Sequence, residues 1–251
     1  MEYVDINTAI KADGLRIILV RGFPSPWGQA AKAMMEYKGL DYTAGPQQAG
    51  QANPELVAWA GTNSGPVVAW NDEPPLNRWN DILLLLERLA PERPLVPETP
   101  AQRIEFFGWA HEICGELGFG WNRRLQGVHM GVQAGHKPGI LGDKYGYTQR
   151  DGELAVPRAI AFMSHLAEQL KNQANRGCEY IIGDHVTAID FYWAAFSNLV
   201  AIQPPEECPL DPAIRPRFEK VTPDVAAAVD PVILAHRDRI MRQYFKIPME
   251  L

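Results

Sequence analysis

Leu15-Arg-Ile-Ile-Leu-Val20 and, one residue later, Gly22-Phe-Pro-Ser-Pro-Trp-Gly28 form the stretch on which the fold of the N-terminal half depends. The first segment is apolar enough for a buried parallel strand. Trp27 to Lys38 contains no proline and is rich in alanine and methionine, which predicts a helix. Ser25 therefore lies between two prolines, at the point where a helix begins.

Two interpretations of Ser25 follow from this position. A helix N-terminus has unpaired N–H groups and about half a positive charge, so it stabilises an anion such as a thiolate. The Ser25 hydroxyl adds a further donor, which makes this serine the candidate catalytic residue. The structural alternative is an ordinary N-cap, with Pro26 at the first helical position and no function.

The composition favours a protein that acts on small molecules. The chain has 251 residues, 46% of them hydrophobic, which suits two small domains. Its net charge is −6 with scattered lysines and arginines, so nucleic acid is not an expected partner. The acidic N-terminus lacks the features of a secretion signal, and the apolar run Ile82 to Leu86 is too short to cross a membrane. Three widely spaced cysteines indicate reduced thiols, and together these features predict a cytoplasmic protein.

Residues 1–90 are expected to form an α+β domain of the thioredoxin-like type. After the first strand and helix, Lys38-Gly39 supplies a helix stop. The further predicted elements are a strand at Leu40 to Ala44, a helix at Pro54 to Ala60, a strand at Pro66 to Trp70, a remnant of a fourth strand at Leu76 and a helix at Asn77 to Ala90.

A proline-rich linker at 91–100 separates this domain from an all-helical C-terminal domain at 101–251. The helical patterns cover Ala101 to Val128, Glu153 to Asn172, Thr187 to Ile202 and Thr222 to Phe245. Gly131 to Gly152 is predicted to be a long loop, which either covers a site or lies disordered on the surface.

Three motifs together resemble the glutathione transferases. In the second half, Gly183-Asp184 precedes Thr187-Ala-Ile-Asp190, which has the spacing of a capping box and resembles the buried-helix motif of that family. In the first half, Pro24-Ser-Pro-Trp-Gly28 with Glu36-Tyr-Lys-Gly-Leu40 resembles its serine-type members, notably the plant tau class. Gly65-Pro66, just before Val67, resembles the family's residue and cis proline ahead of the third strand. The resemblance extends from Leu15 to the last helix.

The resemblance implies the glutathione transferase fold and glutathione as co-substrate. It implies that Ser25 is catalytic and that Gly65 and Pro66 hold the cysteinyl unit through the backbone. It also implies a homodimer and a role in detoxification, and it requires no metal. In such an enzyme, glutathione is held as a thiolate that attacks a small hydrophobic electrophile.

One motif departs from the family's pattern. At the helix leading to Ile82, the family has an acidic residue and a serine that hold the γ-glutamyl end of glutathione; here these positions are Arg78 and Trp79. The helix N-terminus can still receive a carboxylate, with Arg78 as a partner. The α-ammonium loses its acidic partner, which costs roughly one to a few kcal/mol of binding free energy. Alternatively, Arg78 is a solvated helix end and Trp79 a core or interface aromatic residue.

Aromatic residues are the candidates for the electrophile site between the domains. They are Phe23, Trp27, Phe106 and Trp109. The last two are three residues apart and share a helix face, which is also typical of core packing.

Other polar groups indicate weaker alternatives. His111 and Cys114 share a helical turn as zinc ligands do, but no second pair follows. Arg123-Arg124 either attracts an anionic substrate or forms a solvated helix face.

A second hypothesis for the whole protein is a transferase-fold protein that does not catalyse but binds a ligand or a partner protein. Arg78-Trp79 favours it, and Ser25 argues against it.

Overall fold

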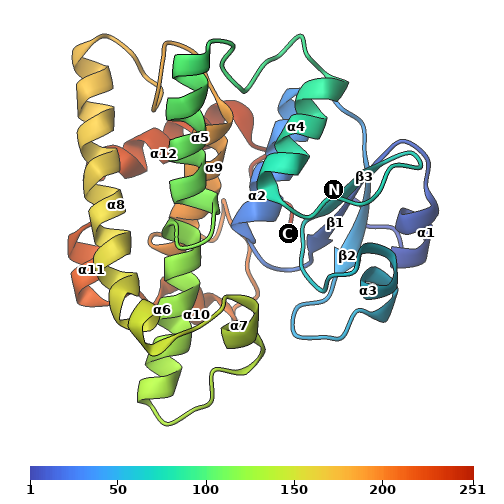
Figure 1. Ribbon diagram of the computed structural model, residues 1–251, viewed down its shortest axis with the longest axis horizontal. Helices are drawn as coiled ribbons and strands as arrows, with labels where there is room; N and C mark the ends of the chain where they lie inside the picture. Colours follow the sequence, from blue (N-terminus) through green and yellow to red (C-terminus); the bar gives the residue numbers. More distant parts are fainter.

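The computed structural model describes residues 1–251 and shows a small sheet with helices on both faces, followed by a group of helices (Figure 1). The strands are β1 (Leu15–Val20), β2 (Thr43–Gln47) and β3 (Val67–Trp70). The central strand β1 is parallel to β2 and antiparallel to β3. The helices of this half are α1 (Ile6–Lys11), α2 (Pro26–Tyr37), α3 (Pro54–Ala60) and α4 (Trp79–Leu89). The predicted α+β architecture is confirmed.

One predicted strand begins at a different residue from the observed one. The second strand begins at Thr43 rather than Leu40, because the Leu40 N–H donates to the carbonyl of Met35 and so belongs to the end of α2. Leu76 forms a single antiparallel bridge with Val68, which agrees with the expected remnant of a fourth strand.

The side chains of β1 alternate between two apolar layers. Ile17 and Leu19 join the main core with α2 and α4, whereas Ile18 packs with Leu56 of α3 and Ala9 of α1 on the other face. A strand covered on both faces is expected to be mainly apolar, which explains Leu15 and Ile17 to Val20. Arg16 is the exception, and its guanidinium donates to the backbone carbonyls of Ala12 and Asn71. Its C-terminal end then leads directly to the loop that carries Ser25.

The N-terminal residues, to which the sequence assigns no role, cover the sheet through α1. A Cβ atom at Gly45 on β2 would lie 2.6 Å from the Ala9 methyl group and 2.6 Å from Ile18 Cδ1. Glycine at this position therefore allows α1 to approach the sheet closely.

Helices alone make up the second half. They are α5 (Pro100–Cys114), α6 (Phe119–Gln133), α7 (Gly139–Lys144), α8 (Gln149–Asn175), α9 (Ala188–Phe196), α10 (Arg215–Glu219), α11 (Pro223–Ala227) and α12 (Pro231–Tyr244), with a 3-10 turn η1 (Ser197–Leu199). None of the helices has the length and apolarity needed to cross a membrane.

Three predicted helical segments of this half are interrupted. The segment Ala101 to Val128 is broken after Cys114, where Leu117 adopts a φ of +60°. The segment Thr222 to Phe245 is broken where Asp230 caps α12. After Phe196, α9 gives way to η1, and the expected loop Gly131 to Gly152 contains α7.

A buried lysine fixes the chain between the two halves. Lys38 Nζ, whose side chain is completely buried, lies 2.7 Å from Glu87 Oε1 and donates to the carbonyls of Ala90 and Arg93 at 2.8 Å each. Glu87 in turn accepts from the N–H of Leu95 at 3.0 Å. The segment that follows α4 is thus hydrogen-bonded to both α2 and α4.

The buried carboxylate of Asp190 organises α9, whose residues are all buried. Asp190 accepts from the N–H of Ile181 at 3.0 Å, and from the N–H and hydroxyl of Thr187 at 2.8 and 3.1 Å. His236 Nε2 of α12 lies 3.1 Å from its Oδ1 atom. The capping box predicted from the sequence is confirmed. Because α9 packs against α2, α5 and α12, this cap fixes the contact between the two halves.

Replacing Asp190 by alanine should destabilise the protein strongly. Asp190→Ala leaves buried donors without an acceptor, so the free energy of unfolding should fall by about 3 kcal/mol. Urea unfolding followed by circular dichroism measures this change. Asp184→Ala is the matched control, since its carboxylate is exposed and contacts only the exposed His185. Equal unfolding midpoints for Asp190→Ala and the wild type would contradict the role of the cap.

Candidate functional site

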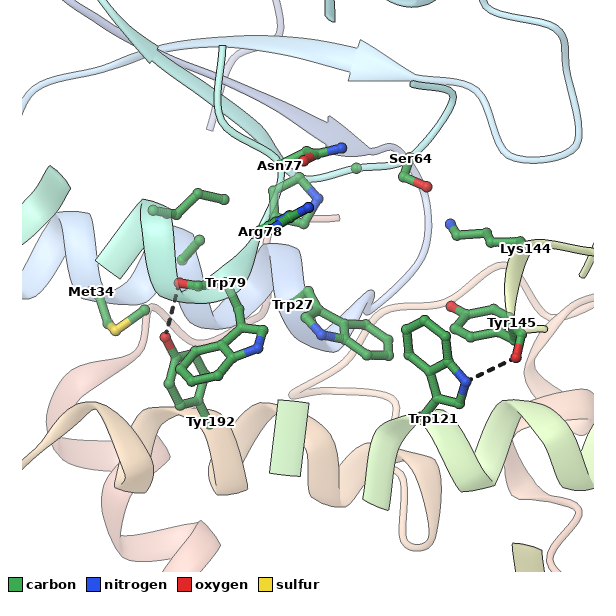
Figure 2. Close-up of a pocket in the computed structure, with 14 residues that line it drawn as sticks. Trp27, Met34, Ser64, Asn77, Arg78, Trp79, Trp121, Lys144, Tyr145 and Tyr192 are labelled. Carbon is green, nitrogen blue, oxygen red and sulfur yellow. Dashed lines mark hydrogen bonds between the residues drawn. The ribbon is translucent and has the colours of Figure 1, made fainter. Parts of the chain in front are cut away.

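A pocket of ≈ 280 Å³ lies between the sheet side and the helical side of the molecule (Figure 2). Its sheet side is formed by the turn before β3, the inner face of α2 and the start of α4. Its helical side is formed by residues of α6, α7 and α9 and the residue after α7. The lining residues are Trp27, Ala31, Met34, Ser64, Gly65, Pro66, Asn77, Arg78, Trp79, Ile82, Trp121, Lys144, Tyr145 and Tyr192. A largely apolar cleft with a few polar groups is typical of a small-molecule site.

Trp27, in the first turn of α2, joins the sheet side to the helical side. Its indole N–H donates to the carbonyl of Cys114 at 3.0 Å, and its ring meets Phe196 edge-on with centroids 4.7 Å apart. These contacts fix the ring as one wall of the pocket.

Ser25 lies at the start of α2 but does not line this pocket. It holds the N-cap position, yet its side chain makes no hydrogen bond to the helix. A Cβ atom at Gly28 would lie 4.0 Å from Ser25 Oγ, so the hydroxyl lies beside the first turn of α2. The amides of Trp27 and Gly28 have no backbone acceptor. The start of α2 therefore offers a free hydroxyl and free N–H groups.

Gly65 and Pro66 lie at the sheet end of the pocket, and the peptide bond between them is cis, as the resemblance implies. A Cβ atom at Gly65 would lie 3.4 Å from the carbonyl oxygen of Ile18 and 3.4 Å from the amide nitrogen of Val20. The turn therefore lies in close contact with the end of β1.

The start of α4 is open toward solvent and carries positive charge. Arg78 is the N-cap residue, is exposed and makes no side-chain cap hydrogen bond. Trp79 packs edge-on against Tyr192 with centroids 5.8 Å apart, and the Tyr192 hydroxyl donates to the Trp79 carbonyl at 3.5 Å (Figure 2). Trp79 is thus both a pocket wall and a contact between the two halves.

The charges of the pocket are cations without carboxylates. Arg78 and Lys144 are its charged lining residues, and no aspartate or glutamate belongs to the lining. Desolvation by the surrounding protein, and then the charge of Arg124, lower the pKa of Lys144. An anionic group of a ligand can therefore bind to two positively charged side chains here. An ammonium group of a ligand has no negatively charged side chain to bind.

The helical side contributes residues that the sequence does not identify. Trp121 of α6 donates its indole N–H to the Tyr145 carbonyl at 2.9 Å. Figure 2 shows the Tyr145 hydroxyl pointing into the pocket, together with the ammonium of Lys144. Burial raises the pKa of Tyr145, so its hydroxyl stays protonated and can donate. For Lys144 and Tyr145, the only signal is the glycine-rich segment Gly131 to Gly152, which the sequence predicts either to cover a site or to lie disordered. Nothing in the sequence indicates Trp121.

The other predicted site residues lie elsewhere. Phe23 packs against Phe218 with centroids 6.1 Å apart and does not line the pocket. Phe106 is fully buried in the main core. Trp109 stacks on His165 of α8 with centroids 5.0 Å apart and lines a separate surface pocket. The shared face of α5 is therefore used for packing against other helices.

No group of three His, Cys, Asp or Glu side chains is arranged to hold a metal ion. Cys114, one of the two residues considered as zinc ligands, is buried, and burial raises the pKa of its thiol well above the usual value. A protonated buried thiol is a poor metal ligand.

Comparison with known proteins shows a likeness of structure. No protein-family model matches the chain, and no curated protein matches its sequence. Among solved structures, a glutathione S-transferase from Methylobacterium radiotolerans in complex with glutathione sulfonate is 16% identical, with a TM-score of 0.62 over 92% of each chain. A tau-class glutathione S-transferase from mango is 15% identical, with a TM-score of 0.55 over 93% of this chain and 99% of that one. The chain has the glutathione transferase fold.

Ure2p in complex with glutathione shares the glutathione transferase fold as well, with 13% identity and a TM-score of 0.61 over 92% of this chain and 95% of that one. The fold predicted from the motifs at Pro24 to Gly28, Gly65-Pro66 and Thr187 to Asp190 is thus confirmed. Five predicted site residues meet in the pocket, namely Trp27, Gly65, Pro66, Arg78 and Trp79.

Tryptophan fluorescence distinguishes this pocket from the surface pocket beside Trp109. Glutathione, the co-substrate that the sequence resemblance implies, should at saturation change the emission of the wild type, because a bound ligand alters the surroundings of the lining indoles. We expect Trp121→Phe to lose a large part of this change, since Trp121 lines the pocket. Trp109→Phe is the matched control and should keep it. Loss of the change in Trp109→Phe alone would place the ligand between α5 and α8.

Proposed function

We propose that the chain binds glutathione in the pocket between its two halves and holds the sulfur as a thiolate for attack on a small hydrophobic electrophile. The observation that carries the proposal is the meeting of Gly65-Pro66, the open start of α4 and helix α2 around one pocket. In support, two proteins with the same fold have been solved in complex with glutathione sulfonate and with glutathione, respectively.

The pocket fits glutathione in part. The peptide groups at Gly65 and Pro66 can pair with the cysteinyl unit. The γ-glutamyl carboxylate can bind at the start of α4, where free N–H groups and the Arg78 guanidinium favour an anion. The γ-glutamyl ammonium has no carboxylate partner among the lining residues. We therefore expect weaker binding of glutathione than an acidic residue at position 78 would give.

Activation of the sulfur is assigned to the start of α2. A thiol with a pKa near 8.5 is only a few per cent ionised at neutral pH, so stabilising the thiolate raises the reactive fraction. The free hydroxyl of Ser25 and the free N–H groups of Trp27 and Gly28 can do so. The thiol proton passes to solvent. The sulfur lone pair then forms the new carbon–sulfur bond, while the electrophile releases a leaving group with its bonding electrons or takes the electrons into a conjugated acceptor.

The proposal includes three further expectations from the sequence. These are a division into residues 1–90, 91–100 and 101–251, a homodimer, and a cytoplasmic location. We expect the electrophile to pack against the aromatic rings that line the pocket. Of the four aromatic residues that the sequence suggests for the electrophile site, Trp27 is the one that lines it.

A non-catalytic ligand-binding protein is the second candidate. Two observations favour it: Ser25 is not among the lining residues, and Arg78 occupies the acidic position of the family's motif. Saturable glutathione binding without conjugation of any electrophile in a panel of aryl halides and enones would favour this second function.

Removal of the Ser25 hydroxyl tests sulfur activation. Ser25→Ala should lower kcat/KM for conjugation at least tenfold, about 1.4 kcal/mol in the barrier. Steady-state assays across pH measure this change, and the apparent thiol pKa should rise in the variant. Ser164→Ala, an exposed serine of α8, is the control and should keep wild-type kinetics. An unchanged pH profile in Ser25→Ala would assign activation to another group.

Charge reversal at the start of α4 tests how the γ-glutamyl end is held. Arg78→Glu, alone or with Trp79→Ser, gives the ammonium a partner and should tighten glutathione binding by about 1 kcal/mol, roughly fivefold. Isothermal titration calorimetry measures this affinity without depending on Trp79 emission. Arg88→Glu, at the far end of α4, makes the same charge change outside the pocket. Weaker binding in Arg78→Glu than in Arg88→Glu would show that Arg78 holds the carboxylate instead.

A further inference from the structure

A second pocket, of ≈ 390 Å³, lies in the helical half between α6 and the chain that follows α9. It is distinct from the candidate glutathione site, since the two share no lining residue. We call it the basic pocket. Its lining residues are Arg123, Arg124, Gln126, Gly127, Met130, Asn198, Leu199, Arg217, Phe218, Lys220 and Thr222. Four of them are cations and none is a carboxylate, in a chain whose net charge is −6.

The four cations of the basic pocket have no ion-pair partner. None of the ion pairs between side chains includes Arg123, Arg124, Arg217 or Lys220. Arg215, the nearest arginine along the chain to Arg217, is instead neutralised by Glu219 at 2.6 Å. The Asp224 carboxylate acts on Arg123 from outside the pocket lining without forming an ion pair. Four like charges with so little compensation repel one another, so a bound anion lowers the energy of the folded protein.

Neutral hydrogen bonds hold the inner arginine in place. Arg123 donates from Nε and Nη2 to the carbonyl of Leu199 at 3.2 and 2.9 Å, and from Nη1 to Gln126 Oε1. Gln126, itself buried, donates to the Thr222 hydroxyl at 3.1 Å and so links α6 to the opposite wall. Burial, and then the charge of Arg124, lower the pKa of Arg123 to about 10, which still leaves it charged at neutral pH.

The remaining walls define what kind of anion fits. Met130, Leu199 and Phe218 supply the apolar surface of the basic pocket. The volume exceeds that of a phosphate group and leaves room for a small organic group attached to it. Guanidinium groups bind phosphate oxygens in pairs, and Arg124 and Arg217 supply such groups. Arg123 donates its Nε and Nη2 groups to the Leu199 carbonyl and adds mainly its charge.

We propose that the basic pocket binds a small phosphate monoester, with the phosphate among the four cations and the organic group against Phe218. The site adds a ligand to the chain beyond the proposed glutathione function. The exposed Arg217 and Lys220 close one side of the ligand, and Arg123 and Arg124 form the other.

Phenyl phosphate is the probe, and isothermal titration calorimetry on the full chain is the measurement. The wild type should bind it saturably and more weakly as salt is raised. Arg217→Gln/Lys220→Gln should weaken binding at least tenfold. Both side chains are exposed, so the fold should be preserved, as circular dichroism will check. Arg150→Gln/Arg176→Gln removes the same charge from exposed positions on and just beyond α8 and should keep wild-type affinity.

Several outcomes would overturn the proposal. These are absence of saturable binding, equal weakening in both double variants, and equal affinity for benzoate, which carries one charge. Displacement of phenyl phosphate by saturating glutathione would place the probe in the first pocket instead. If an oligonucleotide binds but phenyl phosphate does not, the ligand of the basic pocket is a nucleic acid rather than a small phosphate monoester. Because the test does not measure conjugation, its result is independent of whether the proposed transferase activity holds.

Discussion

The remaining structure depends on the contacts of one buried carboxylate, that of Asp190. It accepts hydrogen bonds from the amides of Ile181 and Thr187 and lies beside the imidazole of His236. It fixes the start of α9, and α9 is the helix against which α2 packs from the sheet side. A buried charge of this kind adds little net stability by itself, but its hydrogen bonds are satisfied only in one arrangement of the chain. The position of α2, and with it the placement of Ser25 and Trp27, therefore depends on a group far from the pocket in sequence.

Positive charge is the shared character of both pockets. An acidic chain concentrates unpaired cations at two places, Arg78 with Lys144 in one and the four cations of the basic pocket in the other. Arg124 connects them, because it lines the basic pocket while its charge acts on Lys144 of the first. Anions are consequently attracted to this side of the molecule although its net charge repels them, and the attraction will weaken as ionic strength rises.

The parts of the fold that could be predicted from the sequence depend on local chemistry. Three segments have a conformation that their own residues determine. They are the mainly apolar run Leu15 to Val20, the prolines and glycines around Ser25, and the capping box Thr187 to Asp190. The break after Cys114 could not be predicted, because the helical pattern of the sequence continues across it while Leu117 turns the backbone. The helical wall of the pocket could not be predicted, since Lys144 and Tyr145 reach it only through the course of a glycine-rich segment. Periodicity likewise identifies the face shared by Phe106 and Trp109, but it does not tell which neighbour that face meets.

The buried ammonium of Lys38 has a consequence for how a ligand reaches the pocket. Its partners Glu87, Ala90 and Arg93 belong to α4 and the chain just after it, so these contacts hold the start of the linker against the sheet side. The Ala188 N–H donates to the Leu95 carbonyl at 3.0 Å and so ties the same segment to the start of α9. Wide hinge opening would therefore have to break the contacts of this segment and also separate α2 from the buried helix α9. Helix α7 is only six residues long and brings Lys144 and Tyr145 to the rim. Exchange with solvent is therefore expected to follow small displacements of α7, with an association rate set by that short helix rather than by motion of whole domains.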